Sequence, residues 1–386
     1  MSENLVQKPH LVSIAQGSYK FGSNLLLQAT TPDQNAVFSS YSISSVISMA
    51  ALGARGNTLQ QIKEALHLPE DMELLKSAYS DITSVTKSDD NITLEVANSV
   101  FPSKRLELRE EYLSDVKKHF QSEIQSLDFN QAEEARKIMN DWVLQQTNGK
   151  VKELFALGSI NTDTVNVLVN AIYFKGDWLA KFDPINTTER DFFVSSEKIV
   201  KVPTMFASDI KYASTYNEDL KCTIAALPYK GERITMYLLV PEERFGLGEL
   251  EQKVATDAFN PSTLDKLIHR NKTPIYLPKF KLESFHDLGD ACKSLGLKDM
   301  FDEKSDFSGM AGGPGELYVS KIAQKAIIEV NEEGSEAAAA TMIIPTCTSM
   351  IITKPLVVDR PFIFIIKDKS TGLVLFSGKV VDPSST

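Results

Sequence analysis

The chain has 386 residues, of which 42% are hydrophobic and 24% charged, and its net charge is −10 with a pI near 5.2. This composition is ordinary for a globular protein. The acidic balance excludes a general nucleic-acid surface, which needs clustered Lys and Arg to neutralise phosphate groups. The longest apolar runs are strand-length and fall short of the roughly 18–20 residues that cross a membrane. We therefore expect neither a nucleic acid nor a membrane as a partner.

No linker rich in Pro, Gly or Ser, no block of charge and no internal repeat divides the sequence. Residues 1–386 are expected to form one domain, and the chain is expected to be a monomer. The three cysteines, Cys222, Cys292 and Cys347, are odd in number and lack CxxC spacing, so neither a disulfide framework nor a metal site is predicted. The first residues carry no basic-then-apolar signal pattern. We expect an intracellular protein as written, or a secreted one if a leader was removed before this numbering begins.

The spacing of apolar residues predicts an α+β fold. Helical spacing predicts helices over 15–28, 39–53, 58–66 and 133–146. Ser42, Ser44 and Ser45 near the start of the second helix are typical of a helix cap. Alternating or continuous apolar runs predict strands over 92–100, 165–174, 223–227, 235–240, 273–282, 317–330, 357–367 and 373–380. Helices dominate early and strands later, which favours α+β over a repeated βαβ arrangement.

The unusual segment is residues 331–359, which connects two strand-like runs. A connection this long inside a compact domain is usually functional or disordered. One interpretation is a short Ala-rich helix followed by an edge strand, because Ala is the best helix former.

A second interpretation is a segment that lies in solvent at first and later enters a sheet as a strand. Alternate side chains of an inserted strand face the core. One alternate set is small or modestly polar, namely Ser335, Ala337, Ala339 and Thr341. The other set is Glu336, Ala338, Ala340 and Met342. Gly334 supplies a hinge, since glycine adopts backbone conformations closed to other residues.

Several motifs, in order along the chain, resemble those of the serpins, a family of protease inhibitors. They are FSSYSI at 38–43, GARGNT at 53–58, NDWV at 140–143, TNGK at 147–150, NAIYFKGDW at 170–178, LPKF at 277–280 and DRPF at 359–362. The hinge of inhibitory serpins is matched by Glu332, Glu333, Gly334, Ser335, Glu336, Ala337, Ala338, Ala339, Ala340 and Thr341. The nearest resemblance is to insect-type serpins.

The resemblance implies three β-sheets, about nine helices, an exposed reactive loop at about 332–358 and a metastable native state. It also implies a suicide mechanism without a cofactor. The target protease attacks the loop and forms an acyl-enzyme, and the cleaved loop then inserts as a central strand. About 15 residues at roughly 3.3 Å each carry the attached protease on the order of 50 Å.

Two groups of site residues follow from the resemblance. Trp178, Lys279 and Glu332 match the breach, where the main sheet first opens, and Glu332 is expected to pair with Lys279. The alternative is an ordinary surface ion pair worth under about 1 kcal/mol.

The second group is the shutter, a polar cluster under the middle of the sheet. It is matched by Ser39, Ser42 and Asn170. Where many serpins have His, this chain has Gln324. An amide both donates and accepts hydrogen bonds, so we expect the cluster to persist without pH sensitivity.

The family spacing from Glu332 places the scissile bond at Thr348–Ser349. Counting back from Asp359 gives Met350–Ile351, and Cys347–Thr348 is a third option. No Lys or Arg lies between 337 and 353, which disfavours trypsin-like proteases, whose pocket contains a buried Asp.

The candidate residues favour other protease classes. Thr348 suits an elastase-like pocket and Met350 a chymotrypsin-like one, while Cys347 leaves papain-like proteases open. Lys76 and Lys87 are isolated, so heparin is not an expected partner.

An enzyme is disfavoured, because the sequence holds no HExxH, G-x-S-x-G or P-loop motif. A non-inhibitory serpin, acting as a carrier or chaperone, remains the alternative. Bulky or charged hinge residues are frequent in such proteins, and the run from Ser335 to Thr341 differs from them.

Overall fold

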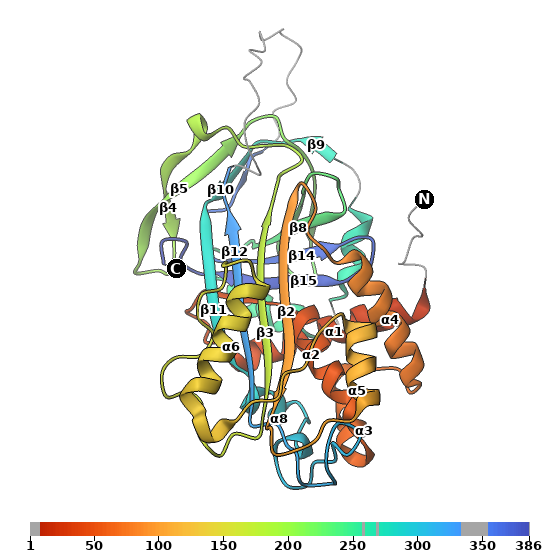
Figure 1. The fold of residues 1–386 in the computed structure, drawn as a ribbon. Coiled ribbons are helices and arrows are strands. Elements are labelled where there is room, and N and C mark those ends of the chain that lie inside the picture. The colour runs from red at the N-terminus through yellow and green to blue at the C-terminus, as the bar shows by residue number, and fades with distance from the viewer. Residues whose placement is uncertain (1–7, 257–258, 268–269, 333–353, 386) are drawn as a thin grey trace.

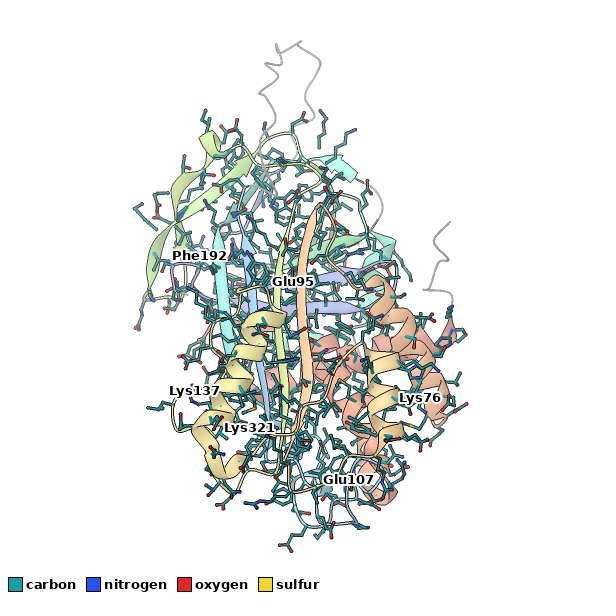
Figure 2. All side chains as sticks on the ribbon, in the orientation of Figure 1. Lys76, Glu95, Glu107, Lys137, Phe192 and Lys321 are labelled. Carbon is teal, nitrogen blue, oxygen red and sulfur yellow. The ribbon has the colours of Figure 1, made fainter. Side chains whose placement is uncertain are left out.

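A computed structural model describes residues 8–256, 259–267, 270–332 and 354–385 of the chain. Within these ranges it contains eight α-helices, five short 3₁₀ or π segments and three β-sheets (Figure 1). The expected α+β fold with three sheets is confirmed. None of the helices in the described ranges is long and apolar enough to span a membrane. Side chains fill the space between the sheets and the helices that flank them (Figure 2).

Most of the helices precede the central strands. The α-helices are α1 (Pro9–Ala29), α2 (Ser40–Gly53), α3 (Gly56–Leu66), α4 (Met72–Val85), α5 (Glu110–Asp115), α6 (Ala132–Gln146), α7 (Leu247–Ala255) and α8 (Gly289–Ser294). The shorter segments are η2 (Val116–Phe120), η3 (Phe129–Gln131), η4 (Pro184–Asn186), η5 (Pro261–Lys266) and η6 (Asp299–Phe301). The capping prediction for α2 was wrong in its residues. Ser39 is the N-cap, and its hydroxyl accepts a hydrogen bond from the Ser42 backbone N–H.

The main sheet has four strands in the order β11-β12-β3-β2. Their bounds are β11 (Phe280–Asp287), β12 (Lys321–Val330), β3 (Asn166–Gly176) and β2 (Ile92–Pro102). Helix α6 lies across the front of this sheet (Figure 1). An apolar cluster joins Met139 and Val143 of α6 to Val169 and Ala171 of β3. Helix α2 packs on the opposite face, which explains why β3 is apolar on both faces and lacks alternation.

One pairing in the main sheet differs from the others. β12 runs parallel to β3, with register from Lys321 opposite Val167 to Ile328 opposite Phe174. The β11–β12 and β2–β3 pairs are antiparallel. β12 also extends farther along β11, where Val330 is opposite Phe280. The last two residues of β12 therefore have a strand neighbour on one side only.

Two further sheets complete the fold. The seven-stranded sheet is β1 (Ala36–Phe38), β15 (Val374–Val380), β14 (Phe362–Asp368), β8 (Ile234–Pro241), β7 (Cys222–Pro228), β6 (Lys211–Asn217) and β9 (Arg270–Lys272), in that order. The second four-stranded sheet is β13 (Leu356–Val357), β10 (Ile275–Pro278), β5 (Ile199–Ala207) and β4 (Thr188–Phe193). β13 is parallel to β10, with Ile275 opposite Leu356.

Three predicted strands differ in the structure. The run 273–282 is two strands in different sheets, β10 and β11, because the chain changes sheet at Lys279, after a proline that has no N–H to donate. The run 357–367 is likewise divided, into β13 and β14, by a segment that contains Pro361. The run 317–330 becomes a strand only from Lys321.

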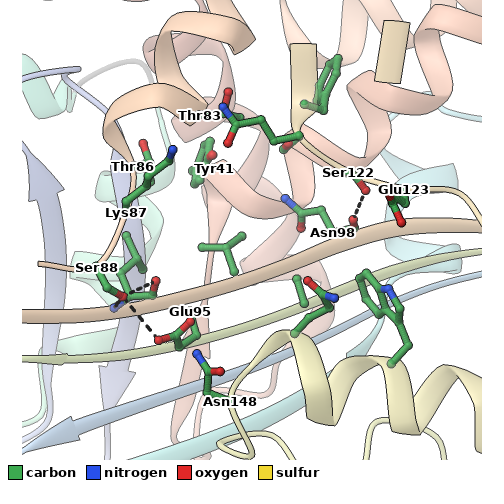
Figure 3. A pocket seen from close by; sticks show the side chains of 18 residues that line it. Tyr41, Thr83, Thr86, Lys87, Ser88, Glu95, Asn98, Ser122, Glu123 and Asn148 are labelled. Atoms are coloured by element: carbon green, nitrogen blue, oxygen red, sulfur yellow. Dashed lines mark hydrogen bonds between the residues drawn. The ribbon is translucent and has the colours of Figure 1, made fainter. Parts of the chain in front are cut away.

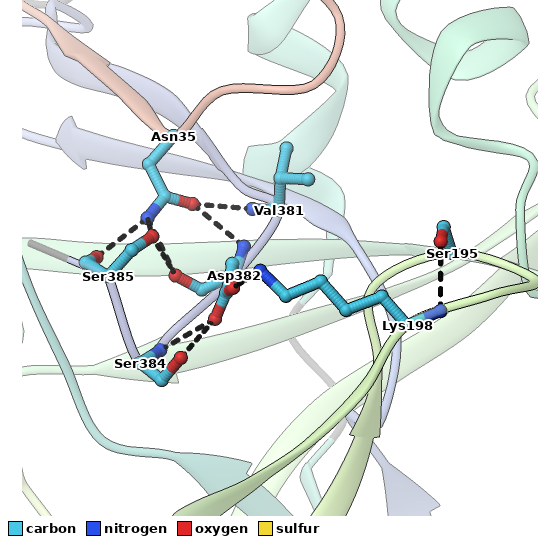
Figure 4. Close-up of polar contacts among 7 residues, drawn as sticks. All are labelled: Asn35, Ser195, Lys198, Val381, Asp382, Ser384 and Ser385. Carbon is cyan, nitrogen blue, oxygen red and sulfur yellow. Dashed lines mark hydrogen bonds and ion pairs between the residues drawn. The ribbon is translucent and has the colours of Figure 1, made fainter.

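The C-terminal segment is fixed by one side chain (Figure 4). Asn35 accepts hydrogen bonds from the backbone N–H groups of Val381 and Asp382, at 2.7 and 2.9 Å. Its amide donates to the Asp382 carbonyl at 2.7 Å, and Lys198 pairs with the Asp382 carboxylate at 2.6 Å. The end of the chain is thereby held against the segment that precedes β1.

Candidate functional site

The predicted reactive segment connects β12 to β13, and most of it lies outside the described residues. Outside them are the hinge residues Glu333, Gly334, Ser335, Glu336, Ala337, Ala338, Ala339, Ala340 and Thr341 and the reactive-bond candidates Cys347, Thr348, Ser349 and Met350. The structure does describe Glu332, where this segment begins. It therefore shows the part of the main sheet that the segment leaves.

The carboxylate of Glu332 has two side-chain partners. Lys279 Nζ lies 2.8 Å from Glu332 Oε2, and the Thr187 hydroxyl donates to Oε1 at 2.7 Å. The Glu332 side chain is 8% exposed and that of Lys279 is 37% exposed, so only the lysine lies at the surface. Burial raises the pKa of Glu332, but the hydrogen bonds from Lys279 and Thr187 outweigh it and hold the pKa below its usual range.

Trp178 holds the residue before Glu332. Its indole N–H donates to the Asn331 carbonyl at 2.9 Å. The indole ring is buried and stacks on Tyr229, with 4.4 Å between centroids. The structure thus brings Trp178, Lys279 and Glu332 together, as the breach prediction requires. Thr187 was missed by sequence reasoning, since nothing in its surroundings marks it as a partner of Glu332.

The shutter residues form a hydrogen-bonded network between α2 and the main sheet. Gln324 and Asn170 are opposite each other on β12 and β3. The Gln324 amide donates to Asn170 Oδ1 at 2.6 Å and to the Ser39 carbonyl at 3.1 Å, while its Oε1 accepts from the Ser39 N–H at 2.9 Å. All three residues are fully buried. The amide therefore both donates and accepts, and it joins the two parallel strands directly.

Asn98 of β2 extends this network to a third strand. Asn170 donates to Asn98 Oδ1 and to the Ser42 hydroxyl, and Ser42 donates to Asn98 Oδ1 at 3.0 Å. Sequence reasoning missed Asn98, because only the register of β2 on β3 places it opposite Asn170. The carboxamides of Gln324, Asn170 and Asn98 thus lie side by side across three adjacent strands, next to the start of α2.

A hollow of about 680 Å³ lies beside β2, and Asn98 is among the residues that line it (Figure 3). Two hydroxyl groups bond to the edge of β2 there. Ser88 bonds to both the N–H and the carbonyl of Leu94, at 2.9 and 3.0 Å, and Ser122 donates to the Asn98 carbonyl at 2.6 Å. Side chains thus satisfy part of the edge of the main sheet.

A histidine lies next to the shutter, although Gln324 itself does not titrate. His286 on β11 is opposite Gln324 on β12, is 8% exposed, and has Nε2 3.2 Å from the Val37 carbonyl. Burial lowers the pKa of His286 below its usual range, and the contact with Val37 only partly opposes this. The expected absence of pH sensitivity thus applies to Gln324 but not to the strand beside it.

We expect the stability of the protein to fall as the pH drops below about 6.5, the ordinary histidine pKa. The unfolded chain then binds a proton at residue 286 that the folded chain binds only at lower pH. The His286→Asn variant should show a smaller loss of melting temperature between pH 7.5 and 5.5 than the wild type. Equal losses in both proteins would rule out His286 as the titrating group.

The ion pair at Glu332 should show a different pH dependence. Because its folded pKa is lowered, Glu332 contributes stability above the ordinary value near 4.5, and loses it as the pH falls through the folded pKa. Glu332→Gln should lower the melting temperature by about 1–3 °C at pH 7, and this difference should shrink below pH 4.5. Lys279→Met combined with Glu332→Gln should cost less than the sum of the single changes. A difference that is constant with pH, with additive variants, would contradict the pairing.

Comparisons with known proteins agree with this geometry. The family model described as serpin (serine protease inhibitor) matches residues 16–383. The leukocyte elastase inhibitor of Bos taurus is 36% identical over 377 residues, which cover 96% of this chain and 99% of that protein.

Two solved structures show the same fold. Serpin48, described as a highly specific serpin of the insect Tenebrio molitor, has a TM-score of 0.84 and 31% identity, with 97% of this chain and 99% of that chain covered. A serpin of Arabidopsis in its native stressed conformation has a TM-score of 0.85 and 29% identity, with 97% and 98% covered. A mammalian, an insect and a plant serpin are thus among its relatives, and the resemblance to the insect type stays a prediction. The chain belongs to the serpin family of protease inhibitors.

Proposed function

We propose that this serpin is a suicide substrate, which traps its target protease by inserting the part of the cleaved loop on the N-terminal side of the cut, residues 333–348 for a cut at Thr348–Ser349, between β3 and β12. The observation that carries the proposal is the parallel pairing of these two strands in a sheet whose other pairs are antiparallel. The proposed reactive segment begins directly after one of them.

The direction of the chain makes this pair a suitable place for a new strand. A segment that leaves the end of β12 and folds back runs antiparallel to β12. Since β3 is parallel to β12, the same segment also runs antiparallel to β3. Insertion would replace one parallel pairing with two antiparallel ones, and antiparallel pairing is slightly more stable per residue. The sheet thus gains hydrogen bonds without a reversal of any strand already present.

The contacts at the breach and shutter support an ordered opening. At the breach, β12 already extends two residues beyond its pairing with β3. Lower in the sheet, insertion must break the hydrogen bond between Gln324 and Asn170. We therefore propose that Trp178, Lys279 and Glu332 position the entry point, while Gln324 and Asn170 keep the strands closed until cleavage.

The chemistry follows from a nucleophilic protease. Its serine oxygen, or cysteine sulfur, bonds to the carbonyl carbon on the N-terminal side of the scissile bond, and the peptide C–N bond breaks to release a new amine. We propose Thr348–Ser349 as this bond, with Cys347–Thr348 and Met350–Ile351 as alternatives. The acyl-enzyme then moves with the inserting strand, by about 3.3 Å per residue, before water can hydrolyse the ester or thioester.

The proposed targets are elastase-like proteases, with chymotrypsin-like and papain-like proteases as further candidates. The absence of Lys and Arg from 337–353 disfavours trypsin-like enzymes. The name of the Bos taurus relative, a leukocyte elastase inhibitor, supports the elastase-like class.

A protease panel tests the mechanism. The wild type should form a complex stable in SDS with an elastase-like protease, and mass mapping of the released C-terminal peptide should identify the cut. Ser335→Arg should lower the yield of this complex at least tenfold, because a charge would have to enter the core. Cleaved wild-type protein should also melt well above the intact form, whereas cleaved Ser335→Arg should not.

Glu336→Arg is the matched control, since the next residue of an inserted strand faces away from the core. It should retain most of the complex. Simple nicking of the wild type, with no complex for any protease, would overturn inhibition and favour a carrier or chaperone. Complex formation by Ser335→Arg at the wild-type yield would contradict the insertion step.

The shutter has its own test. Gln324→Ala leaves the Ser39 N–H and Asn170 Oδ1 buried without their partner, at a cost of about 1–3 kcal/mol for each group. A synthetic peptide with the sequence of residues 334–345 should therefore enter the sheet of this variant faster than that of the wild type, as followed by the rise in melting temperature. Gln60→Ala, on an exposed face of α3, should leave the rate unchanged. An unchanged rate in Gln324→Ala would show that this residue does not hold the strands together.

A further inference from the structure

A second cavity, of about 520 Å³, lies where α2 ends, away from the breach and the shutter. Residues of α3, α4 and α5 and the turn Ser308–Gly309 also line it. Its volume is within the range of about 300–1,000 Å³ typical of small-molecule sites. Part of its wall is apolar, and the residues of that part are Ala51, Leu52, Leu59, Met72 and Tyr112.

Two arginines at this cavity are held by the same turn. The guanidinium of Arg55 lies against Gly309 so closely that a Cβ on this glycine would be 2.4 Å from Arg55 Cζ. Arg109 donates from Nε to the Ser308 carbonyl. The two guanidinium groups thus contact adjacent residues of one turn, and both side chains are exposed.

Neither guanidinium group has a carboxylate partner among the residues that the structure describes. Arg55 uses Nη1 to donate to the Leu52 and Ala54 carbonyls, at 3.0 and 2.7 Å. Within the described part of the chain, Nε and Nη2 of Arg55 donate no hydrogen bond. The same is true of Nη1 of Arg109. An arginine has five N–H donors in a fork that fits carboxylate and phosphate groups. Donors therefore remain for an anion.

The other charges at the cavity are mostly engaged. Lys76 pairs with Asp115 at 2.7 Å and with Glu73 at 2.8 Å. Glu111 is exposed and lines the same cavity, so it opposes the binding of an anion. The cavity is thus cationic where Arg55 and Arg109 lie and apolar along the neighbouring wall.

We propose that this cavity binds an amphipathic anion, with a carboxylate or phosphate head group on Arg55 and Arg109 and a hydrocarbon chain against Leu52, Leu59 and Met72. Charge complementarity selects the head group, and the apolar wall selects the chain. The residues that line the site lie between Ala51 and Gly309 in the sequence and play no part in the proposed inhibitory mechanism.

Isothermal titration calorimetry of the intact protein with decanoate, decyl phosphate and decanol tests the proposal. At least one of the two anions should bind more tightly than decanol, and their relative affinities distinguish a carboxylate from a phosphate ligand. Arg55→Gln and Arg109→Gln should each weaken anion binding about tenfold, the expected loss of one charged hydrogen bond. Glu111→Gln should strengthen it, because a repelling charge is removed.

Arg105→Gln, whose arginine bonds to Asn130 instead, is the matched control and should bind as the wild type does. Leu59→Trp, which fills the cavity and keeps both arginines, should abolish binding even if an arginine variant folds poorly. The proposal fails if no anion binds at millimolar concentration, if decanol binds as well as the anions, or if the arginine variants and Leu59→Trp bind as the wild type does.

Discussion

The hydrogen bond between Gln324 and Asn170 joins two strands that are parallel neighbours only as long as no other strand lies between them. It is buried, and each of its members has a further partner: Gln324 bonds to Ser39, the N-cap of α2, and Asn170 bonds to Ser42 of α2 and Asn98 of β2. A buried carboxamide that loses its partner costs more free energy than the bond itself contributes. Under the proposed mechanism, this network supplies the barrier to opening of the main sheet, and the two new antiparallel pairings supply the gain in free energy.

The breach and the shutter are built from different kinds of interaction. At the breach, the ion pair of Glu332 and Lys279 and the indole of Trp178 act at the surface end of β12. The shutter uses neutral amides and hydroxyl groups inside the core, where a charge would carry a large desolvation cost. His286 is the exception, since it is a titratable group buried one strand away from Gln324. As the pH falls, the loss of stability through His286 therefore begins nearer neutral pH than the loss through Glu332, because the ordinary pKa of histidine is higher than that of glutamate.

Much of this fold follows from sequence pattern, and the failures have physical causes. The continuous apolar run of β3 predicts a strand covered on both faces, and α2 and α6 do cover it. β4 went unpredicted because its first four residues are exposed, which leaves no alternation to detect. The helix α4 was also missed, although Asp71 caps its start through the Glu73 N–H. The division of 273–282 has a sequence signal in Pro278, but apolar residues on both sides of this proline led to the prediction of a single strand.

Site residues could be predicted where they belong to a recognisable sequence motif. They could not be predicted where only the pairing register of the strands brings them to the site. Gln324 and Asn170 were identified by the family resemblance. Asn98, Thr187 and His286 come from other strands or loops and reach the site only through tertiary pairing. A single sequence holds no local signal for such neighbours.

The short stretch from Ile275 to Lys279 contacts both ends of the segment that was proposed to meet the protease. Ile275 is opposite Leu356 at the far end, and Lys279 pairs with Glu332 at the near end. The residues at the two ends of this segment, Glu332 and Leu356, are therefore held by residues that are only a few positions apart in the chain. When the two ends of a loop are held close together, doubling its number of residues raises the entropic free-energy cost of closing it by only about 0.6 kcal/mol. The closure entropy of this connection therefore places only a weak constraint on the number of residues between Glu332 and Leu356.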